Sequence, residues 1–122
     1  MATTVLLIED EPNIKEAVSF ILERDGCTVH SLADGATALA AVARHTPDVV
    51  ILDIMLPGQS GLEVLRRLRA DPATAGLPVL MLTAKGQARD RAEAEALGVD
   101  RFMTKPFSNR EVLAAVRELA GP

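Results

Sequence analysis

Asp48-Val49-Val50-Ile51-Leu52-Asp53 is the stretch from which the fold of this 122-residue chain can be predicted. Four consecutive apolar residues, most of them β-branched, are typical of a short strand buried on both faces of a parallel sheet. The apolar run stops at Asp53, and Ile54-Met55-Leu56-Pro57-Gly58 continues as a loop. Because ligands of open α/β sheets bind beyond the carboxyl ends of the strands, Asp53 is a candidate functional carboxylate. The alternative is an Asp that only ends the strand and caps a turn, and this stretch alone does not decide between them.

The composition predicts one domain with an aliphatic core. We expect a single domain over residues 1–122, with residues 120–122 either a true terminus or the start of a linker. Hydrophobic residues make up 48% of the chain and aromatic residues only 2%, so stacking platforms for single-stranded nucleic acid are absent. The net charge of -4 argues against direct binding of nucleic acid by this chain.

The sequence gives no sign of a membrane or secretory destination. No stretch approaches the roughly 20 apolar residues of a membrane span, and the N-terminus lacks the basic and apolar regions of a signal peptide. A single cysteine, Cys27, cannot form an internal disulfide, which favours a reducing, cytoplasmic location. Cys27 opens a predicted strand, and we expect its thiol to be buried.

Apolar runs alternate with helical patterns five times along the chain. Strands are predicted at residues 5–8, 28–31, 49–52, 79–82 and 99–103. Helices with amphipathic spacing are predicted to follow each strand, at about residues 12–25, 35–44, 61–70, 87–97 and 109–119. Ser60 with Glu63, and Ser108 with Glu111, form capping-box patterns. The alternation predicts an α/β fold, a doubly wound, five-stranded parallel sheet of the flavodoxin-like (βα)5 type with strand order 2-1-3-4-5.

Polar residues stand where four of the five predicted strands end. In the predicted strand order, Glu9 and Asp10 follow the first strand beside Asp53, while Thr83 ends the fourth and Lys105 follows the fifth. Three carboxylates close together must raise a pKa or hold a cation. All-oxygen ligands indicate a hard ion, Mg²⁺ before Ca²⁺. A carboxylate can also act as a nucleophile towards phosphorus, with a metal ion and an ammonium neutralising the charge. Taken singly, each of these residues has an ordinary structural explanation as a cap, a strand end or a solvated loop lysine.

Four motifs in order give the chain a family resemblance. From Thr4 to Leu119 the sequence resembles the receiver domains of bacterial two-component response regulators, which are CheY-like proteins of phosphorelay signal transduction. The motifs are Leu7-Ile8-Glu9-Asp10-Glu11, Ile51-Leu52-Asp53-Ile54-Met55-Leu56-Pro57-Gly58-Gln59-Ser60-Gly61, Leu82-Thr83-Ala84 and Thr104-Lys105-Pro106-Phe107. Each is weak alone, but the four together, at the ends of strands one, three, four and five, are specific.

The resemblance implies a phosphorylation site. Asp53 would be the phosphoacceptor, forming an aspartyl phosphate with a group donated by a sensor histidine kinase or a histidine phosphotransfer protein. The chain would then be no turnover enzyme, catalysing only its own Mg-dependent phosphorylation and dephosphorylation. Thr83 and Lys105 would contact the phosphoryl group. The metal, Mg²⁺ with Mn²⁺ as the alternative, would be ligated by Asp10, Asp53 and the Met55 backbone carbonyl, with Glu9 acting directly or through water.

The resemblance also implies a switch. Phe102 matches the aromatic residue that moves with Thr83, and a cis peptide is implied at Lys105-Pro106. Two departures are that Glu9 stands where Asp is commoner, and that Phe102 replaces Tyr and so lacks a hydroxyl. The output face would comprise the fourth helix, the fifth strand and the fifth helix, acting on a downstream output domain or effector protein.

Some members of the family dimerise through ion pairs on this output face. The candidate interface residues here are Arg91, Asp100, Arg101, Glu111 and Arg117. Arg101, Ala96 and Ala115 occupy places where complementary charges would be expected, so both a monomer and a phosphorylation-dependent dimer stay open.

Three other readings compete with a receiver domain. A dehalogenase-type phosphatase also uses a strand-ending Asp with Mg²⁺, but needs a second Asp where Met55 stands. A flavin or dinucleotide module shares the fold class, but no G-x-G-x-x-G follows any predicted strand. A degenerate receiver that serves only as a docking scaffold would not be expected to keep Asp10, Asp53, Thr83 and Lys105. No helix-turn-helix for DNA is left in these residues.

Overall fold

A computed structural model describes residues 2–84 and 88–121. The five strands of one sheet are β1 (Thr4–Ile8), β2 (Thr28–Leu32), β3 (Val49–Asp53), β4 (Val79–Thr83) and β5 (Arg101–Thr104). The helices that alternate with them are α1 (Pro12–Arg24), α2 (Ala38–His45), α3 (Gly61–Ala70), α4 (Ala88–Ala96) and α5 (Asn109–Ala120). The predicted alternation of strands and helices is confirmed.

The sheet is parallel throughout, with the order β2-β1-β3-β4-β5, as predicted. Every residue of β3 and β4 is buried, because these central strands are covered on both faces. In register, Ile8 lies beside Leu52, and Asp53 lies beside Leu82. Since all strands point the same way, the residues that follow β1, β3, β4 and β5 meet at one edge of the sheet.

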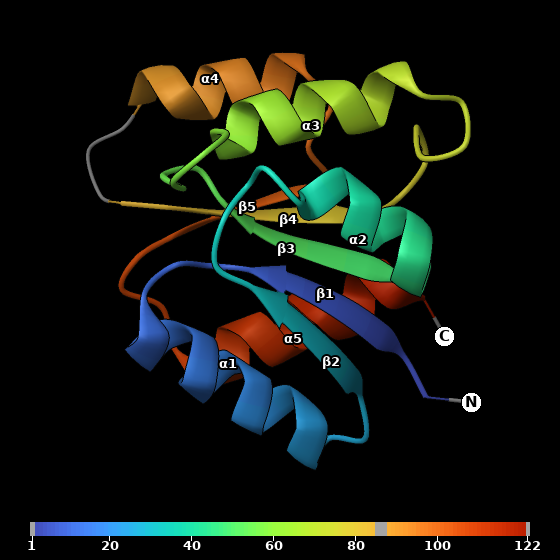
Figure 1. Cartoon of the computed structure of the whole chain (residues 1–122). Helices are drawn as coiled ribbons and strands as arrows, with labels where there is room; N and C mark the ends of the chain where they lie inside the picture. Colours follow the sequence, from blue (N-terminus) through green and yellow to red (C-terminus); the bar gives the residue numbers. More distant parts are fainter. Residues whose placement is uncertain (1, 85–87, 122) are drawn as a thin grey trace.

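Helices form a layer on each side of the sheet (Figure 1). The helices α1 and α5 cover one face, where buried residues of the two helices, such as Leu22 and Val116, pack on Leu7 and Ile51. The other face is covered by α2, α3 and α4, with Leu65 and Leu68 packed near Val50. The core is almost entirely aliphatic, as the composition requires.

Helix α4 is held to the rest of the domain by little apolar surface. Ala94 is its one fully buried residue among those whose side chains are described, and Ala92 and Ala96 are exposed. Its neighbour is α3, and Leu97 just beyond its end is half-buried. Alanine side chains bury little area, so α4 is weakly anchored by apolar contacts.

The end of α4 is fixed by a network of polar contacts around Arg69 of α3. Its guanidinium donates to the Gly98 carbonyl at 3.0 Å, the Leu77 carbonyl at 2.8 Å and Asp100 Oδ2 at 2.7 Å. The same Asp100 oxygen accepts from the amide of Val79, the first residue of β4, at 2.8 Å. The side chains of Arg69 and Asp100 therefore join the turn after α4 to the start of β4.

The structure corrects several local expectations. The fifth strand begins at Arg101 rather than residue 99, because the Val99 amide still bonds to the Ala94 carbonyl at the end of α4. Cys27 lies one residue before β2 and is half-buried, not buried. The Ser108–Glu111 capping box is complete.

The other predicted capping box, at Ser60 and Glu63, is only half formed. The Ser60 hydroxyl accepts from the Glu63 amide at 3.2 Å, but the Glu63 carboxylate pairs with Arg66 and Arg67 of its own helix. The start of the predicted fourth helix, at residue 87, falls outside the described residues. In the part of the chain that is described, no helix has the length and apolar character needed to cross a membrane.

Candidate functional site

Polar residues at or just after the ends of four neighbouring strands meet at the carboxyl edge of the sheet. Glu9 follows β1, Asp53 closes β3, Thr83 closes β4 and Lys105 follows β5. Glu9, Asp53 and Thr83 are buried although they are polar. The Glu9 amide is bonded to the Leu32 carbonyl at 3.0 Å, and the Lys105 amide to the Thr83 carbonyl at 2.7 Å, so backbone bonds to neighbouring strands fix both residues.

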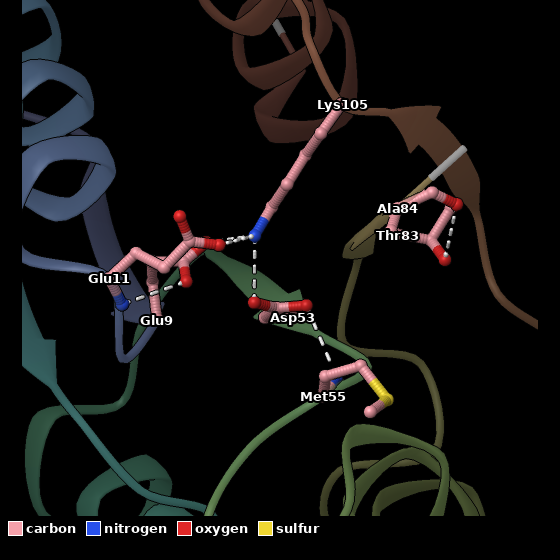
Figure 2. A network of polar contacts seen from close by, with 7 residues as sticks. All are labelled: Glu9, Glu11, Asp53, Met55, Thr83, Ala84 and Lys105. Atoms are coloured by element: carbon pink, nitrogen blue, oxygen red, sulfur yellow. Dashed lines mark hydrogen bonds and ion pairs between the residues drawn. The ribbon is translucent and has the colours of Figure 1, made fainter.

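The Lys105 ammonium lies among three carboxylates (Figure 2). Its Nζ is 2.9 Å from Asp53 Oδ2, 2.9 Å from Glu9 Oε1 and 3.0 Å from Glu11 Oε1. The first and third of these contacts are hydrogen bonds, which uses two of the three ammonium protons. Glu9 Oε1 receives no well-directed hydrogen bond from any described residue, so its contact with Lys105 is an ion pair only.

Burial and charge act on the ionisation of this cluster in opposite directions. Burial alone would lower the pKa of the Lys105 ammonium, but its contacts with the Asp53, Glu9 and Glu11 carboxylates outweigh burial and raise that pKa. Burial, together with the contact with the Asp53 carboxyl, raises the pKa of Glu9 to about 7, although Lys105 opposes the shift. Lys105 is therefore charged at neutral pH, and Glu9 holds its proton to a higher pH than an ordinary glutamate does.

Glu9, Asp10 and Asp53 form a cluster that fits a metal ion. One carboxylate oxygen from each lies within 4.8 Å of the others. The buried Glu9 Oε1, without a hydrogen-bond donor, is an atom that a cation would satisfy. All the donors are oxygens and Asp10 is exposed, which suits a hard ion such as Mg²⁺ that keeps several water ligands.

The loop after β3 is folded back against Asp53. The Met55 amide donates to Asp53 Oδ1 at 3.2 Å, and the Ile54 carbonyl accepts from the Gly61 amide at 2.9 Å. These bonds orient one carboxylate oxygen towards the loop, while the other, Oδ2, faces Lys105. Asp53 is therefore a fixed carboxylate, with one oxygen held by a backbone amide and the other by an ammonium.

Thr83 lies on β4 and Phe102 on β5, the two strands on the opposite side of β3 from β1. The Thr83 side chain is 2% exposed, and its hydroxyl donates to the Ala84 carbonyl at 3.4 Å (Figure 2). Phe102 is half-buried, pairs in register with Met81, and lies under the Arg91 guanidinium at 5.4 Å from the ring centre. The Lys105–Pro106 peptide bond, for which a cis form was expected, is cis.

The sequence profile of the family described as "Response regulator receiver domain" matches residues 5–117. This match covers almost the whole fold and all of the acidic edge. The chain belongs to the response regulator receiver domain family. The acidic pocket of this receiver domain comprises Glu9, Asp10 and Asp53.

Curated relatives of this receiver domain include transcriptional regulators. It is 47% identical over 116 residues to the probable transcriptional regulatory protein TcrX of Mycobacterium tuberculosis, covering 95% of this chain and 49% of that protein. It is 38% identical over 117 residues to the phosphate regulon transcriptional regulatory protein PhoB of Escherichia coli, covering 96% of this chain and 51% of that protein. The chain thus spans about half the length of the curated relatives it matches.

Solved structures of similar proteins have the same fold. A putative response regulator from Chloroflexus aurantiacus superimposes with a TM-score of 0.93, at 31% identity and 98% coverage of both chains. The chemotaxis response regulator CheY4 of Vibrio cholerae gives a TM-score of 0.90 at 29% identity, covering 98% of this chain and 99% of that one. The CheY-like, flavodoxin-like fold is confirmed.

The five interface candidates of this receiver domain all contact other residues of the same chain. Asp100 is bonded to Arg69, and Arg101 pairs with Glu118 at 2.7 Å. The others are Arg91 over the Phe102 ring, Glu111 in the capping box of α5, and Arg117 paired with Asp25. A dimer built on these residues would compete with the intrachain contacts.

Sequence reasoning missed three contributors to the pocket. Glu11 was read only as part of an acidic motif before a helix, yet its carboxylate bonds to Lys105. Met55, predicted to contribute its carbonyl to the metal site, also contributes its amide, which donates to Asp53. Gly61 was part of a motif without a role, but a Cβ there would lie 2.1 Å from the Asp53 carbonyl oxygen. Because Glu11 and Lys105 are 94 residues apart, no local sequence pattern predicts their contact.

Proposed function

We propose that Asp53 is the phosphoacceptor of this receiver domain, and that a sensor histidine kinase or a histidine phosphotransfer protein is the donor. The observation that carries the proposal is the position of the Lys105 ammonium, 2.9 Å from Asp53 Oδ2 and next to the acidic cluster. A buried carboxylate held between an amide donor and an ammonium is fixed in position for nucleophilic attack on phosphorus.

The transfer moves one phosphoryl group without a change in oxidation state. An oxygen of the Asp53 carboxylate forms a bond to phosphorus while the bond from phosphorus to the donor's histidine nitrogen breaks. The electron pair of that bond stays on the imidazole. The product is a mixed anhydride on Asp53, which water later hydrolyses, so dephosphorylation takes place at the same site.

A divalent cation and two side chains serve this transfer. Asp10, Asp53 and the Met55 carbonyl, with Glu9 directly or through water, would hold Mg²⁺, with Mn²⁺ as the alternative; the cation neutralises charge on the phosphoryl oxygens. Lys105 contacts those oxygens from its own side, and the Thr83 hydroxyl donates to one of them. The pairing of Lys105 with Asp53 supports its role.

Phosphorylation is read out at α4, β5 and α5. It adds about one and a half to two negative charges beside Thr83. The Thr83 hydroxyl turns towards them, Phe102 follows into the space that is vacated, and α4 is re-seated at low free-energy cost because Ala94 is its one described buried anchor. If Thr83→Ala left every phosphorylation-dependent change in α4 and β5 intact, as measured by hydrogen exchange, this relay would be wrong.

The downstream partner is an output domain or effector protein that recognises the α4–β5–α5 face. A phosphorylation-dependent dimer through this face is compatible with the proposal, as is a monomer. We place the protein in the cytoplasm, where such kinases take their phosphoryl group from ATP.

Intact mass spectrometry tests the proposal. The protein is incubated with acetyl phosphate and Mg²⁺, and we expect one added phosphoryl group. If the metal is chelated before incubation, no group should be added. Asp53→Asn should abolish the label. Asp48→Asn is the matched control, because Asp48 immediately precedes the same strand at its other end and bonds to the Thr4 amide. Continuous phosphate release from a general phosphate ester would instead indicate a phosphatase.

A further inference from the structure

Glu11 is the one carboxylate around Lys105, among the described residues, that lies outside the candidate metal cluster. The ammonium contacts Glu9, Glu11 and Asp53. The metal cluster consists of Glu9, Asp10 and Asp53. Two of the three partners of the ammonium are thus shared with the candidate cation, and Glu11 is not.

This sharing has an electrostatic consequence. A divalent cation held by Asp53 and, directly or through water, by Glu9 would weaken the attraction of both carboxylates for the ammonium and would repel it. Glu11 lies outside the cluster and keeps its contact with the ammonium at 3.0 Å from Lys105 Nζ, although solvent screens the pair because the Glu11 side chain is 58% exposed. The Glu11 carboxylate is therefore the contact that keeps Lys105 at the pocket when the acidic cluster is neutralised.

The backbone of Glu11 is held in place, so the length of its side chain decides whether it reaches Lys105. Glu11 is the N-cap residue of α1, with φ -78° and ψ 113°, and Pro12 follows at the first helical position. Its amide donates to Glu9 Oε2 at 3.1 Å, and its carbonyl accepts from the Lys15 amide at 3.0 Å. Glu11 and Lys105 both line a cavity of about 470 Å³.

We infer that Glu11 is a positioning residue for phosphoryl transfer to Asp53, an inference that rests on the proposed function. Its carboxylate holds the Lys105 ammonium where the phosphoryl oxygens arrive, and it acts only through Lys105. No bond to Glu11 forms or breaks in the reaction. If the Glu11 charge instead repelled anionic donors from the pocket, removing that charge would speed labelling rather than slow it.

Three substitutions at Glu11 separate reach from charge. Glu11→Ala loses both, Glu11→Asp keeps the charge but is shorter by one methylene, and Glu11→Gln keeps an acceptor oxygen at the same reach. We expect the maximal rate of labelling by acetyl phosphate to fall about three- to tenfold in Glu11→Ala and Glu11→Asp, and less in Glu11→Gln. The half-saturating donor concentration should change by less than about twofold. Glu16→Gln, an exposed α1 residue, is the matched control and should behave as wild type.

A repelling charge would be recognised by faster labelling in Glu11→Ala and Glu11→Gln with Glu11→Asp unchanged. That pattern, or wild-type rates in all three variants, would overturn the inference while the label on wild-type Asp53 still supported the proposed function. In a Lys105→Ala background, Glu11→Ala should have no further effect. A loss that persists there would show that Glu11 acts through α1 or Glu9 instead.

A readout independent of activity is the ammonium of Lys105 itself. The chain contains three lysines, so ¹⁵N-lysine labelling gives few side-chain signals, and the Lys105 signal is assigned by its loss in Lys105→Ala. With Mg²⁺ and no donor, slow proton exchange of this signal in wild type and fast exchange in Glu11→Ala are expected. A signal unchanged in Glu11→Ala, or absent from wild type, would contradict the contact. If wild type takes no label, the proposed function fails instead, and this measurement still tests the pairing of Glu11 with Lys105.

Discussion

Lys105 Nζ lies 2.9 Å from Asp53 Oδ2, although 52 residues separate the two in the chain. The contact exists because β3 and β5 end at the same edge of a parallel sheet, with only β4 between them. The Asp53 carboxylate and the Lys105 ammonium are both largely shielded from water, so their interaction is screened less than that of a surface pair.

Lys105→Ala should slow phosphorylation and destabilise the domain. Without the ammonium, the labelling rate should fall about 10- to 100-fold, because the charge on the transferring group loses one fixed counter-charge. The free energy of unfolding at pH 8 should fall by about 1–3 kcal/mol, since Glu9 and Asp53 are left facing each other. Urea denaturation gives the second value, and its pH dependence is the control: the loss should shrink at pH 5, where Glu9 is protonated. An equal loss at both pH values would mean that packing of the lysine stem is responsible.

Glu9→Gln should stabilise the metal-free protein at alkaline pH. The folded state raises the pKa of Glu9 from 4.5 to about 7, so it binds a proton more tightly than the unfolded chain does. This contribution is fully present below pH 4.5 and is lost as pH rises through 7. The free energy of unfolding of wild type should therefore fall between about pH 5 and 8, and Glu9→Gln should be more stable by about 1–3 kcal/mol at pH 8 but not at pH 4.5.

Mg²⁺ supplies the control for Glu9→Gln. Added at pH 8, it should raise the melting temperature of wild type more than that of the variant, because Gln has no charge to offer the ion. Glu16→Gln, on the exposed face of α1, should show neither effect. A wild-type stability that is flat from pH 5 to 8 without metal would contradict the shifted pKa of Glu9.

The sequence was sufficient for the sheet and for most of the pocket because both depend on local patterns. The sequence alternates predicted strands with helical spacing, and this alternation favours one common topology. That topology brings together the polar residues at or just after four strand ends, which are Glu9, Asp53, Thr83 and Lys105. Contacts made by long side chains between distant loops have no such pattern. The bond from Glu11 to Lys105 and that from Arg69 to Asp100 depend on three-dimensional placement, and neither was predicted.

Arg69→Ala should destabilise the domain far more than Arg67→Ala, two residues earlier. Arg69 is 16% exposed and donates to two backbone carbonyls and the Asp100 carboxylate, so its removal takes away three hydrogen bonds at once. We expect a loss of about 2–3 kcal/mol in the free energy of unfolding. Arg67 is mostly exposed and pairs with Glu63 on the same helix, where a loss of about 0–0.5 kcal/mol is expected. In a double-mutant cycle, Arg69→Ala with Asp100→Ala should be less harmful than the sum, and full additivity would mean that the two residues do not interact.

Gly61→Ala should disturb the phosphoacceptor itself. A Cβ at residue 61 would lie 2.1 Å from the Asp53 carbonyl oxygen and 2.9 Å from the Ile54 Cα, both of which are backbone atoms that cannot turn aside. The end of β3 must then move away from α3, carrying Asp53 with it. We expect a loss of about 2–4 kcal/mol in stability and, in whatever fraction stays folded, slower labelling of Asp53. Gly76→Ala is the matched control, because a Cβ there meets nothing within 4 Å, and it should be neutral within about 0.5 kcal/mol. Wild-type labelling kinetics in Gly61→Ala would mean that the close approach of α3 to β3 does not hold Asp53 in place.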